Sequence, residues 1–474
     1  MIAKATPFRR NLLAASICAL PILTMAFSGC KVGPNYSRPA VSVPDQYRDV
    51  APALGGQPAS GNFAEMNWQA VFQDETLQAL IKEALANNYD IRIAATRILQ
   101  ANAQLGITRA NQLPNLSGAF GIDYQRNQFA LNGPTVDTAT LQLTYIVDFW
   151  GQYRRATEAA RANLLASKYA QNVVQTSLIA SIATAYYQLR QFDEQLDIAQ
   201  KTVEADKGIV KINTIKFKGG ESAITDVYQA DLLQQQAEAQ VITSKQAVEQ
   251  TENQISILLG RNPGPIARGL DLKAEPHLPE IPPGLPSALL QRRPDVRQSE
   301  ELLVAANANV GVAKAAFFPQ LPLTALFGAS STALTSFLQG PATVWSLGGQ
   351  ALQPIYNGGA IRSAYHLAWA QRDQAELSYK QTVQQAFGDV NNSLVGYNQS
   401  RLFRMKIEEQ TKTYQDTANL ANVRFNGGYA SFLEVLVTQQ QYFTSEIALT
   451  QAWNAELANY VALYQALGGG WQPQ

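Results

Sequence analysis

The sequence predicts a mainly α-helical protein with a membrane β-barrel portion and two internal repeats per chain. Three observations carry this prediction. A long motif occurs twice, two segments of well over a hundred residues lack proline, and each repeat also holds stretches that alternate apolar and polar residues. Because proline breaks helices and a period of two is typical of strands, the pattern indicates long helices joined to short strands.

The repeat is clearest around two glycine pairs. Residues 216–232 read KFKGGESAITDVYQADL, and residues 424–440, at an offset of 208, read RFNGGYASFLEVLVTQQ. Residues 84–116 match residues 289–321 at an offset of 205. We expect this division: signal peptide 1–29, N-terminal anchor and equatorial segment 30–70, repeat 1 71–260, proline-rich linker 261–286, repeat 2 287–468, and C-terminal tail 469–474.

The first residues are typical of an export signal that ends at a cysteine. Arg9 and Arg10 precede an apolar segment that is too short for the usual membrane span of about 20 residues. The segment ends in Phe27-Ser28-Gly29-Cys30, which resembles the lipobox of bacterial lipoproteins, so Cys30 is expected to carry diacylglycerol and palmitate. The alternative is a plain secretory signal with an incidental cysteine. Lys31, rather than Asp, follows Cys30, which favours the outer membrane.

Composition argues against several classes of protein. Lys+Arg and Asp+Glu each total 37, so no basic excess favours a nucleic-acid partner. No Walker, HExxH or GxSxG motif occurs, and two histidines offer little material for acid–base or metal chemistry. We therefore expect neither an enzyme nor a metal site, and no cofactor besides the lipid on Cys30.

The proline-free segments predict very long helices. A helix from about Gln152 to Phe217 would extend roughly 100 Å, and a second helix from about Ser222 to Leu259 would return along it. Apolar residues in the first helix follow a strict seven-residue repeat, which predicts a left-handed supercoil. They are Leu178, Ile182, Ala185, Leu189, Phe192, Leu196, Ala199 and Val203. The alternative is an ordinary two-helix coiled-coil stalk.

Each repeat also predicts a pair of strands. They fall at about 115–126 and 138–149 in repeat 1, and at about 320–329 and 343–353 in repeat 2. Strands of about ten residues with aromatic ends suit an outer-membrane barrel, and the alternative is a soluble hairpin packed on a helix. We expect Phe120 and Tyr145 to face lipid, and Gln125 and Gln142 to face water.

Four strands cannot form a closed barrel. An open sheet edge in lipid leaves backbone groups unpaired, at a cost of several kcal/mol each. Eight strands would be filled by side chains, so an open conduit requires about twelve. The chain is therefore expected to complete its barrel with at least two further copies.

These features together resemble a known family. The opening CKVGPNYSRP at residues 30–39, the duplication, the strand pairs and the LGGGW ending at Trp471 are similar to the outer-membrane factors. This TolC-like channel-tunnel family serves Gram-negative efflux and type I secretion. The N-terminus resembles its NodT-type lipoprotein branch, which serves resistance-nodulation-division pumps.

The resemblance implies a homotrimer with a twelve-stranded β-barrel in the outer membrane and a twelve-helix α-barrel in the periplasm. It also implies passive conduction of substrates, including drugs, that an inner-membrane transporter delivers through a periplasmic adaptor. A type I secretion exit duct remains an alternative, as does a periplasmic adaptor lipoprotein. Adaptors, however, have one helical hairpin, whereas both hairpins and strand pairs are duplicated here.

The glycine pairs permit the left-handed backbone that reverses a helix, so they are expected to mark two turns. In the family these turns are the periplasmic tips that contact the adaptor. The corresponding residues are Gly219, Gly220, Glu221, Ser222, Gly427, Gly428, Tyr429 and Ala430.

The family's acidic gate positions fall on Asp226 and Glu434. Val437 occupies a place where the family often has a further acid, so the sequence departs from the family's gate network there. For Glu434 an alternative is a capping box with Ser431, in which the carboxylate only satisfies helix N-terminal donors. Asp226 has Ala223 at the equivalent position, which excludes a capping box.

Overall fold

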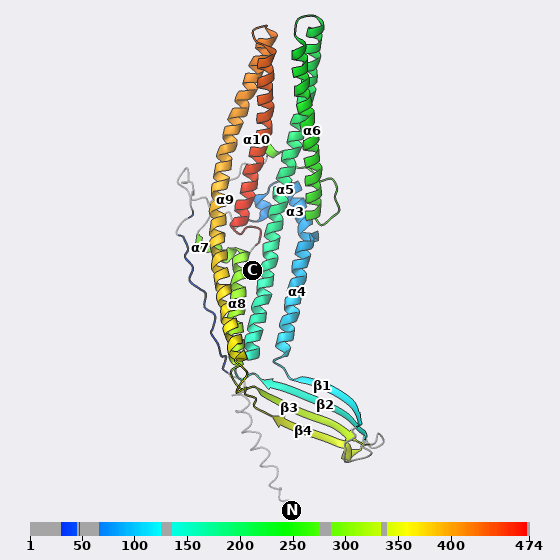
Figure 1. The fold of residues 1–474 in the computed structure, drawn as a ribbon, viewed down its shortest axis with the longest axis vertical. Helices are drawn as coiled ribbons and strands as arrows, with labels where there is room; N and C mark the ends of the chain where they lie inside the picture. Colours follow the sequence, from blue (N-terminus) through cyan, green and yellow to red (C-terminus); the bar gives the residue numbers. More distant parts are fainter. Residues whose placement is uncertain are drawn as a thin grey trace, which may run out of the picture. The chain divides into compact units, whose positions relative to one another are not determined.

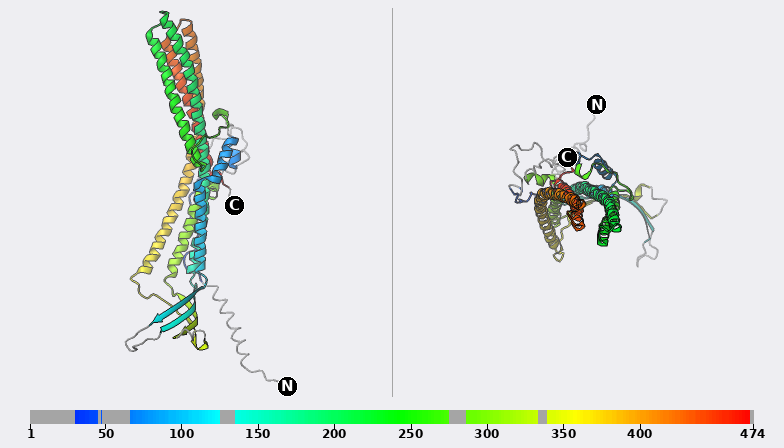
Figure 2. Two further views of the ribbon diagram at one scale, coloured as in Figure 1. Left: turned by 90° about the vertical axis from the view of Figure 1, so that its right-hand side faces the viewer. Right: turned by 90° about the horizontal axis from the view of Figure 1, so that it is seen from above.

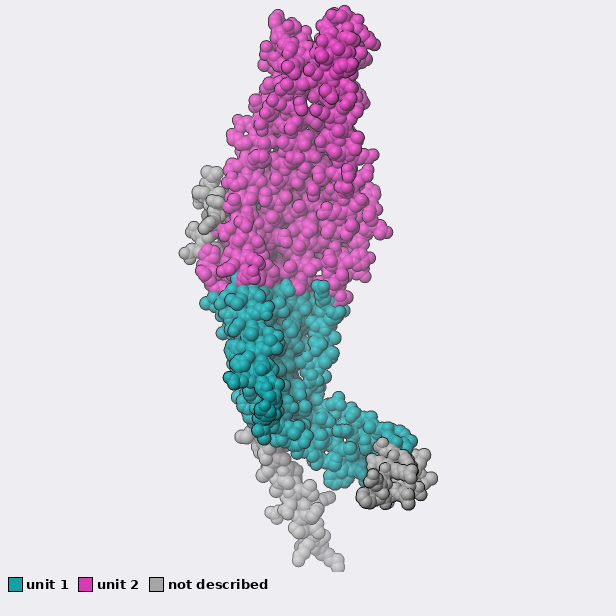
Figure 3. All heavy atoms as spheres, in the orientation of Figure 1, with its two compact units in different colours: residues 1–40, 97–168, 298–380 teal, residues 41–96, 169–297, 381–474 magenta. Residues whose placement is uncertain are grey.

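A computed structural model describes residues 30–44, 47, 66–124, 135–274, 286–332 and 339–471. The chain divides into two compact units, coloured separately in Figure 3. Unit 1 takes residues 1–40, 97–168 and 298–380, and unit 2 takes residues 41–96, 169–297 and 381–474. Each unit therefore combines segments of both expected repeats. The expected signal peptide lies outside the described residues, as do parts of the anchor, linker and tail, and the proposed division stays a prediction.

The main helices repeat in length as well as in order (Figure 1). The first set is α4 (Tyr89–Ala110), α5 (Gln152–Lys218) and α6 (Ile224–Leu258), with 22, 67 and 35 residues. The second set is α8 (Pro294–Ala315), α9 (Ala360–Asn426) and α10 (Phe432–Ala466), with the same three lengths. The long helix expected from about Gln152 is thus present. Among the described residues, no helix combines the length and apolarity needed to span a membrane.

Shorter helices complete unit 2. They are α2 (Trp68–Val71), α3 (Glu75–Asn87) and α7 (Pro286–Arg292), with a short 3-10 turn, η2, at Leu272–Ala274. Asp74 begins α3 because its Oδ1 accepts the N–H of Thr76 at 2.7 Å. The other carboxylate oxygen accepts the hydroxyl of Tyr186 on α5, also at 2.7 Å. The same residue therefore caps one helix and ties it to another.

Four antiparallel strands form one sheet in the order β1-β2-β3-β4 (Figure 1). They are β1 (Asn115–Tyr124), β2 (Thr135–Val147), β3 (Leu321–Ser331) and β4 (Thr343–Gly349). A further 3-10 turn, η4, occupies Gly340–Ala342 before β4. Each of the four strands lies where the alternation predicted one, and both edge strands, β1 and β4, have a single neighbour.

The strand ends differ from those expected. Strand β2 stops at Val147 rather than 149 because the Asp148 carboxylate accepts the N–H of Arg154 at 2.9 Å and so begins the turn into α5. Strand β3 extends to Ser331 because its pairing with β2 continues to Asp137. Strand β4 ends at Gly349, not 353. Beyond it, the N–H of Gln350 donates to Pro322 O at 3.1 Å, and Leu352 forms an isolated bridge with Gln320. The expected end of β1, residues 125–126, lies outside the described residues.

The register gathers large apolar side chains on one face of the sheet. Phe327 pairs with Leu141 on one side and with Trp345 on the other. Residues directly opposite on neighbouring strands point to the same face, so they form a row across the sheet. Phe327 is 61% exposed and Trp345 is 75% exposed. This row is an apolar surface that the described chain leaves open.

Phe120 and Tyr145 lie on that apolar face, because Phe120 is in phase with Leu116, which pairs with Leu143. Gln142 pairs with Ser117 and therefore lies on the opposite face. The expected alternation is thus present in the register. Gln125 lies outside the described residues, and the contact with lipid stays a prediction.

In unit 2 the long helices form two hairpins, α5 with α6 and α9 with α10 (Figure 1, Figure 2). The first residues of the predicted heptad on α5, Leu178 and Ile182, are 5% and 0% exposed. An apolar cluster near the turns joins Ala230 of α6, Ala421 of α9 and Phe432 of α10. Because three helices contribute to one cluster, the alternative of an isolated two-helix stalk is wrong.

Candidate functional site

The two glycine turns have the same backbone hydrogen bonds. In the first turn the N–H of Gly220 donates to Phe217 O at 3.0 Å and the N–H of Glu221 donates to Lys216 O at 2.9 Å. In the second, the corresponding bonds run from Gly428 to Phe425 at 3.0 Å and from Tyr429 to Arg424 at 2.8 Å. This pair of bonds is the Schellman motif, which satisfies the last carbonyls of a helix.

Glycine is required at one position of each turn. Gly220 has φ +79° and Gly428 has φ +77°, both in the left-handed region that L side chains rarely adopt. At both positions an added Cβ would meet nothing within 4 Å. The backbone conformation, rather than a lack of space, therefore demands glycine, as the sequence predicts.

Side chains hold the two turns together. Val435 of α10 belongs to the same cluster as Ala230 of α6, and the rings of Phe425 and Phe432 lie 5.6 Å apart between centroids. The ammonium of Lys216, at the end of α5, lies 4.3 Å from the centroid of the Phe425 ring on α9. A cation above an aromatic face is attracted by the ring quadrupole. The tips of the two hairpins are thus one packed structure.

The two predicted gate acids have different surroundings. Glu434 Oε1 accepts from Arg424 Nη1 at 2.9 Å, across the second turn. Asp226 lies in the first turn of α6, half-buried, and no described residue donates a hydrogen bond or forms an ion pair with its carboxylate. The structure brings both acids close to the glycine turns, and their role as a gate stays a prediction.

The capping box at Glu434 is wrong. Ser431 is the N-cap residue of α10, but its hydroxyl makes no capping hydrogen bond. The Glu434 side chain instead turns toward Arg424, because a charged partner gives a stronger hydrogen bond than a neutral N–H. At the equivalent position of α6, Ala223 provides no cap, as expected. Val437 lies one turn beyond Glu434 and is 42% exposed.

The predicted lipid site lies at the start of a strap in unit 1, the segment of residues 30–40, which forms neither helix nor strand. Cys30 is a free, exposed cysteine. Two residues later, the N–H of Val32 donates to the carbonyl of Trp150 at 3.1 Å, just after β2. Arg155, only 2% exposed, donates to Asn35 Oδ1 at 2.7 Å and to Gly33 O at 3.4 Å. The strap therefore holds Cys30 near the strand ends of this unit.

The strap depends on residues that the sequence reasoning missed. Gly33 has φ +100°, and a Cβ there would lie 2.5 Å from the Cα of Gly311 on α8. Arg38 follows with a pair of bonds to Glu300 on α8, one of them 2.7 Å long. The available signal was the pair of arginines, Arg154 and Arg155, in the first turn of a long helix. No pattern in the sequence links Arg155 to residues more than a hundred positions away.

Among known proteins, the chain matches a model of the outer membrane efflux protein family over residues 80–261 and 285–469. The chain belongs to this family.

Its relatives include a probable efflux pump outer membrane protein, TtgC, of Pseudomonas putida, which is 33% identical over 97% of this chain and 96% of the relative. The cation efflux system protein CusC of Escherichia coli is 30% identical over 95% and 98%. A solved structure of the open state of the Neisseria gonorrhoeae MtrE outer membrane channel superimposes with a TM-score of 0.86 and 28% identity, covering 93% of this chain and 98% of MtrE.

This family membership confirms the main predictions from the sequence. The protein is an outer membrane efflux channel that extends into the periplasm, with the channel-tunnel fold of its family. The family is one of channels rather than enzymes. The family match leaves the roles of individual site residues, the lipid on Cys30 and the identity of the partners as predictions.

Proposed function

We propose that three copies of this chain form the exit duct of a tripartite efflux pump. The observation that carries the proposal is the open four-stranded sheet with an exposed apolar row across it. Both edge strands need partners in lipid, where unpaired backbone groups cost several kcal/mol each. Three sheets of four strands supply the twelve that leave an open lumen. Outer-membrane lipid would then cover the face that bears Phe327 and Trp345.

Two features of the chain, the N-terminal Cys30 and the pair of glycine turns, suggest the partners. An acylated Cys30 anchors the strap in the outer membrane, and its acyl chains together with a spanning barrel give a stable anchor. The glycine turns, with Tyr429 81% exposed, meet a periplasmic adaptor that connects the duct to a resistance-nodulation-division transporter of the inner membrane. Asp226 and Glu434 line the entrance. Relatives carry names for toluene and for cation efflux, so we propose no single cargo.

Native mass spectrometry of the detergent-solubilised protein tests both the assembly and the anchor. We expect a complex of three protomers, each with the added mass of diacylglycerol and a fatty acyl chain. The variant Cys30→Ser should lose the lipid mass and still form trimers, because the barrel does not depend on the anchor.

A stable monomer with full helical and strand content would overturn the trimer. A wild-type protomer of unmodified mass, starting before or after residue 30, would overturn the lipid without affecting the trimer.

A further inference from the structure

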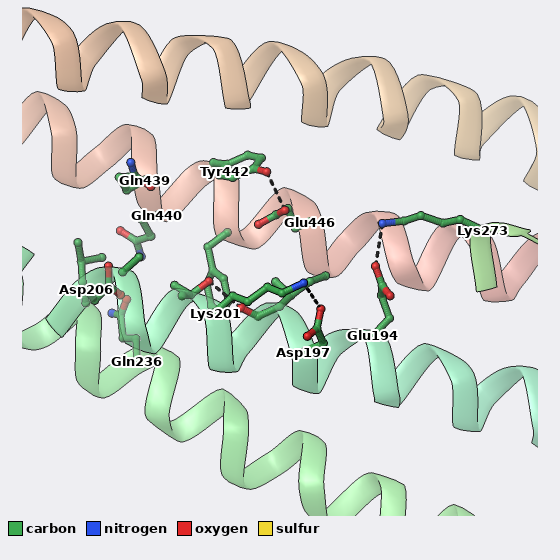
Figure 4. Close-up of a pocket in the computed structure, with 15 residues that line it drawn as sticks. Glu194, Asp197, Lys201, Asp206, Gln236, Lys273, Gln439, Gln440, Tyr442 and Glu446 are labelled. Carbon is green, nitrogen blue, oxygen red and sulfur yellow. Dashed lines mark hydrogen bonds and ion pairs between the residues drawn. The ribbon is translucent and has the colours of Figure 1, made fainter. Parts of the chain in front are cut away.

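Unit 2 contains a polar pocket among helices α5, α6 and α10, with a volume of about 390 Å³ (Figure 4). This volume is in the range of small-molecule sites. The pocket lies on both hairpins, since α5 and α6 belong to one and α10 to the other. No role in conduction, anchoring or closure accounts for it.

Asp206 of α5 is the unusual residue of this pocket. It is only 5% exposed, and no described residue makes a hydrogen bond or an ion pair with its carboxylate. It lies three residues after Val203, at the next core position of the seven-residue repeat, where a supercoiled helix normally has an apolar residue. In Figure 4 it points into the pocket near Gln236 of α6 and Gln440 of α10. A buried carboxylate without a partner is costly.

The basic residues of the pocket are already paired. Lys201 Nζ lies 2.6 Å from Asp197 Oδ2, and Lys273 Nζ lies 2.8 Å from Glu194 Oε1. Neither ammonium is therefore free to neutralise Asp206. The site has room for a positive charge that the chain itself does not supply.

The other side chains that line the pocket determine which kind of cation fits it. Tyr442 and Phe443 contribute aromatic rings, and Ile198 and Leu233 contribute apolar surface. Ca²⁺ and Mg²⁺ take six or more ligands, mostly oxygens, and no group of three acidic, histidine or cysteine side chains suited to a metal occurs in the described part of the chain. One carboxylate without a cationic partner, next to aromatic and apolar side chains in an otherwise polar pocket, instead fits a single positive charge on an apolar body.

We propose that this pocket binds an amphiphilic organic cation, an aromatic or alkyl ammonium compound, whose charge pairs with Asp206. The apolar body lies against Leu233 and Phe443. A bound molecule contacts both hairpins, so occupancy stabilises their packing in unit 2. Every residue that lines the site belongs to unit 2 of one chain.

Ethidium, an aromatic monocation, is a suitable probe for the full-length protein in a neutral detergent. Fluorescence anisotropy at pH 7.5 should show saturable binding. The isosteric change Asp206→Asn should weaken binding by at least about tenfold, as expected for loss of a desolvated charge pair. The matched control is Asp416→Asn, which changes an exposed aspartate of α9 and should bind as the wild type does.

Thermal unfolding separates lost binding from lost structure. Asp206→Asn should unfold at the same temperature as the wild type or about 2–4 °C higher, because a buried unpaired charge is removed. Equal binding by wild type and Asp206→Asn, or no saturable binding by the wild type, would overturn the site. Displacement of ethidium by millimolar Mg²⁺ at constant ionic strength, but not by tetramethylammonium, would assign the site to a metal and overturn the organic cation.

The dependence of binding on pH gives a second readout. Burial raises the pKa of Asp206 to about 6, so the empty site loses its charge below that pH and ethidium affinity should fall. The other titratable groups that line the pocket are Glu194, Asp197 and Lys201 of α5, Tyr442 and Glu446 of α10, and Lys273 of η2, whereas α6 contributes none. Burial also raises the pKa of Glu446, whose carboxylate accepts the Tyr442 hydroxyl at 2.7 Å. In the variant Glu446→Gln, the affinity for ethidium should still fall near pH 6. If the fall in affinity disappears in this variant, the titrating charge belongs to Glu446 and the role of Asp206 is overturned.

Discussion

At the turn between α5 and α6, Lys216 reaches across to the ring of Phe425, whereas at the turn between α9 and α10 the equivalent Arg424 binds Glu434 of its own hairpin. The two basic residues occupy matching places, 208 residues apart, and each gives its carbonyl to the same Schellman hydrogen bond. The two turns therefore have the same backbone hydrogen bonds, but their basic side chains make different contacts.

This difference leaves the two gate acids unequal. The charge of Glu434 is partly neutralised by a guanidinium 2.9 Å away, while Asp226 has no cationic partner among the described residues. In exchange, Lys216 joins the two hairpins. The two turns thus share one backbone structure, but the basic residue of the first turn contacts the other hairpin, whereas that of the second contacts its own hairpin. In the proposed trimer, Asp226 is the acid available to other subunits.

The largest effect on stability is expected from replacing the left-handed glycine that both turns contain. Gly220→Ala and Gly428→Ala should each lower the free energy of unfolding by about 1–2 kcal/mol, the cost of placing an L side chain in the left-handed region. Because neither Cβ would meet another atom within 4 Å, the two costs should agree closely. Thermal or denaturant unfolding of the solubilised protein measures both.

Gly208→Ala is the matched control. Gly208 lies inside α5, exposed, with no atom within 4 Å of an added Cβ and without a positive φ. Alanine should stabilise the helix there by about 0.5–1 kcal/mol. A similar loss of stability at Gly208 and Gly220 would show that the left-handed backbone is not the reason for glycine at the turns.

The contrast between backbone and side chains also explains how far the sequence could predict the structure. Period, proline spacing and glycine pairs are local signals, so they located the long helices, the four strands and both turns. The side-chain contacts are not local. Asn88 donates to Leu258 O at 2.9 Å, and 205 positions later Arg293 donates to Ala466 O at 3.4 Å, an equivalent contact made by different chemistry.

The same reason accounts for what was missed or wrong at the candidate site. Ser431 and Glu434 have the spacing of a capping box, and only the three-dimensional position of Arg424 shows why the carboxylate turns away. Asp206 could have been found, because continuing the heptad from Val203 puts a carboxylate at a core position. That it lacks a partner depends on α6 and α10, which no pattern within α5 reveals.

A smaller effect is expected from removing the link between the turns. Lys216→Gln should lower the free energy of unfolding by about 0.5–1 kcal/mol, through loss of the cation above Phe425. Lys216→Arg should retain most of it. The control Lys218→Gln changes a neighbouring exposed lysine at the same turn and should have no measurable effect. If Lys216→Gln costs nothing in the wild type, or costs as much in a Phe425→Leu background, the ring contact does not join the hairpins.

The smallest effect on stability, and the sharpest on conduction, is expected at the acids. Glu434→Gln should cost about 0.2–1 kcal/mol, the range for an exposed ion pair, and Asp226→Asn should stay within about 0.5 kcal/mol of the wild type. In planar bilayers, however, Asp226→Asn should reduce cation preference more than Glu434→Gln, because a free carboxylate attracts cations more strongly than a paired one. Arg424→Gln should raise cation preference by releasing Glu434. If Asp226→Asn and Glu434→Gln change cation preference equally, the ion pair between Arg424 and Glu434 does not set the charge of the entrance. If the double variant Asp226→Asn, Glu434→Gln keeps the selectivity of the wild type, neither residue belongs to the gate.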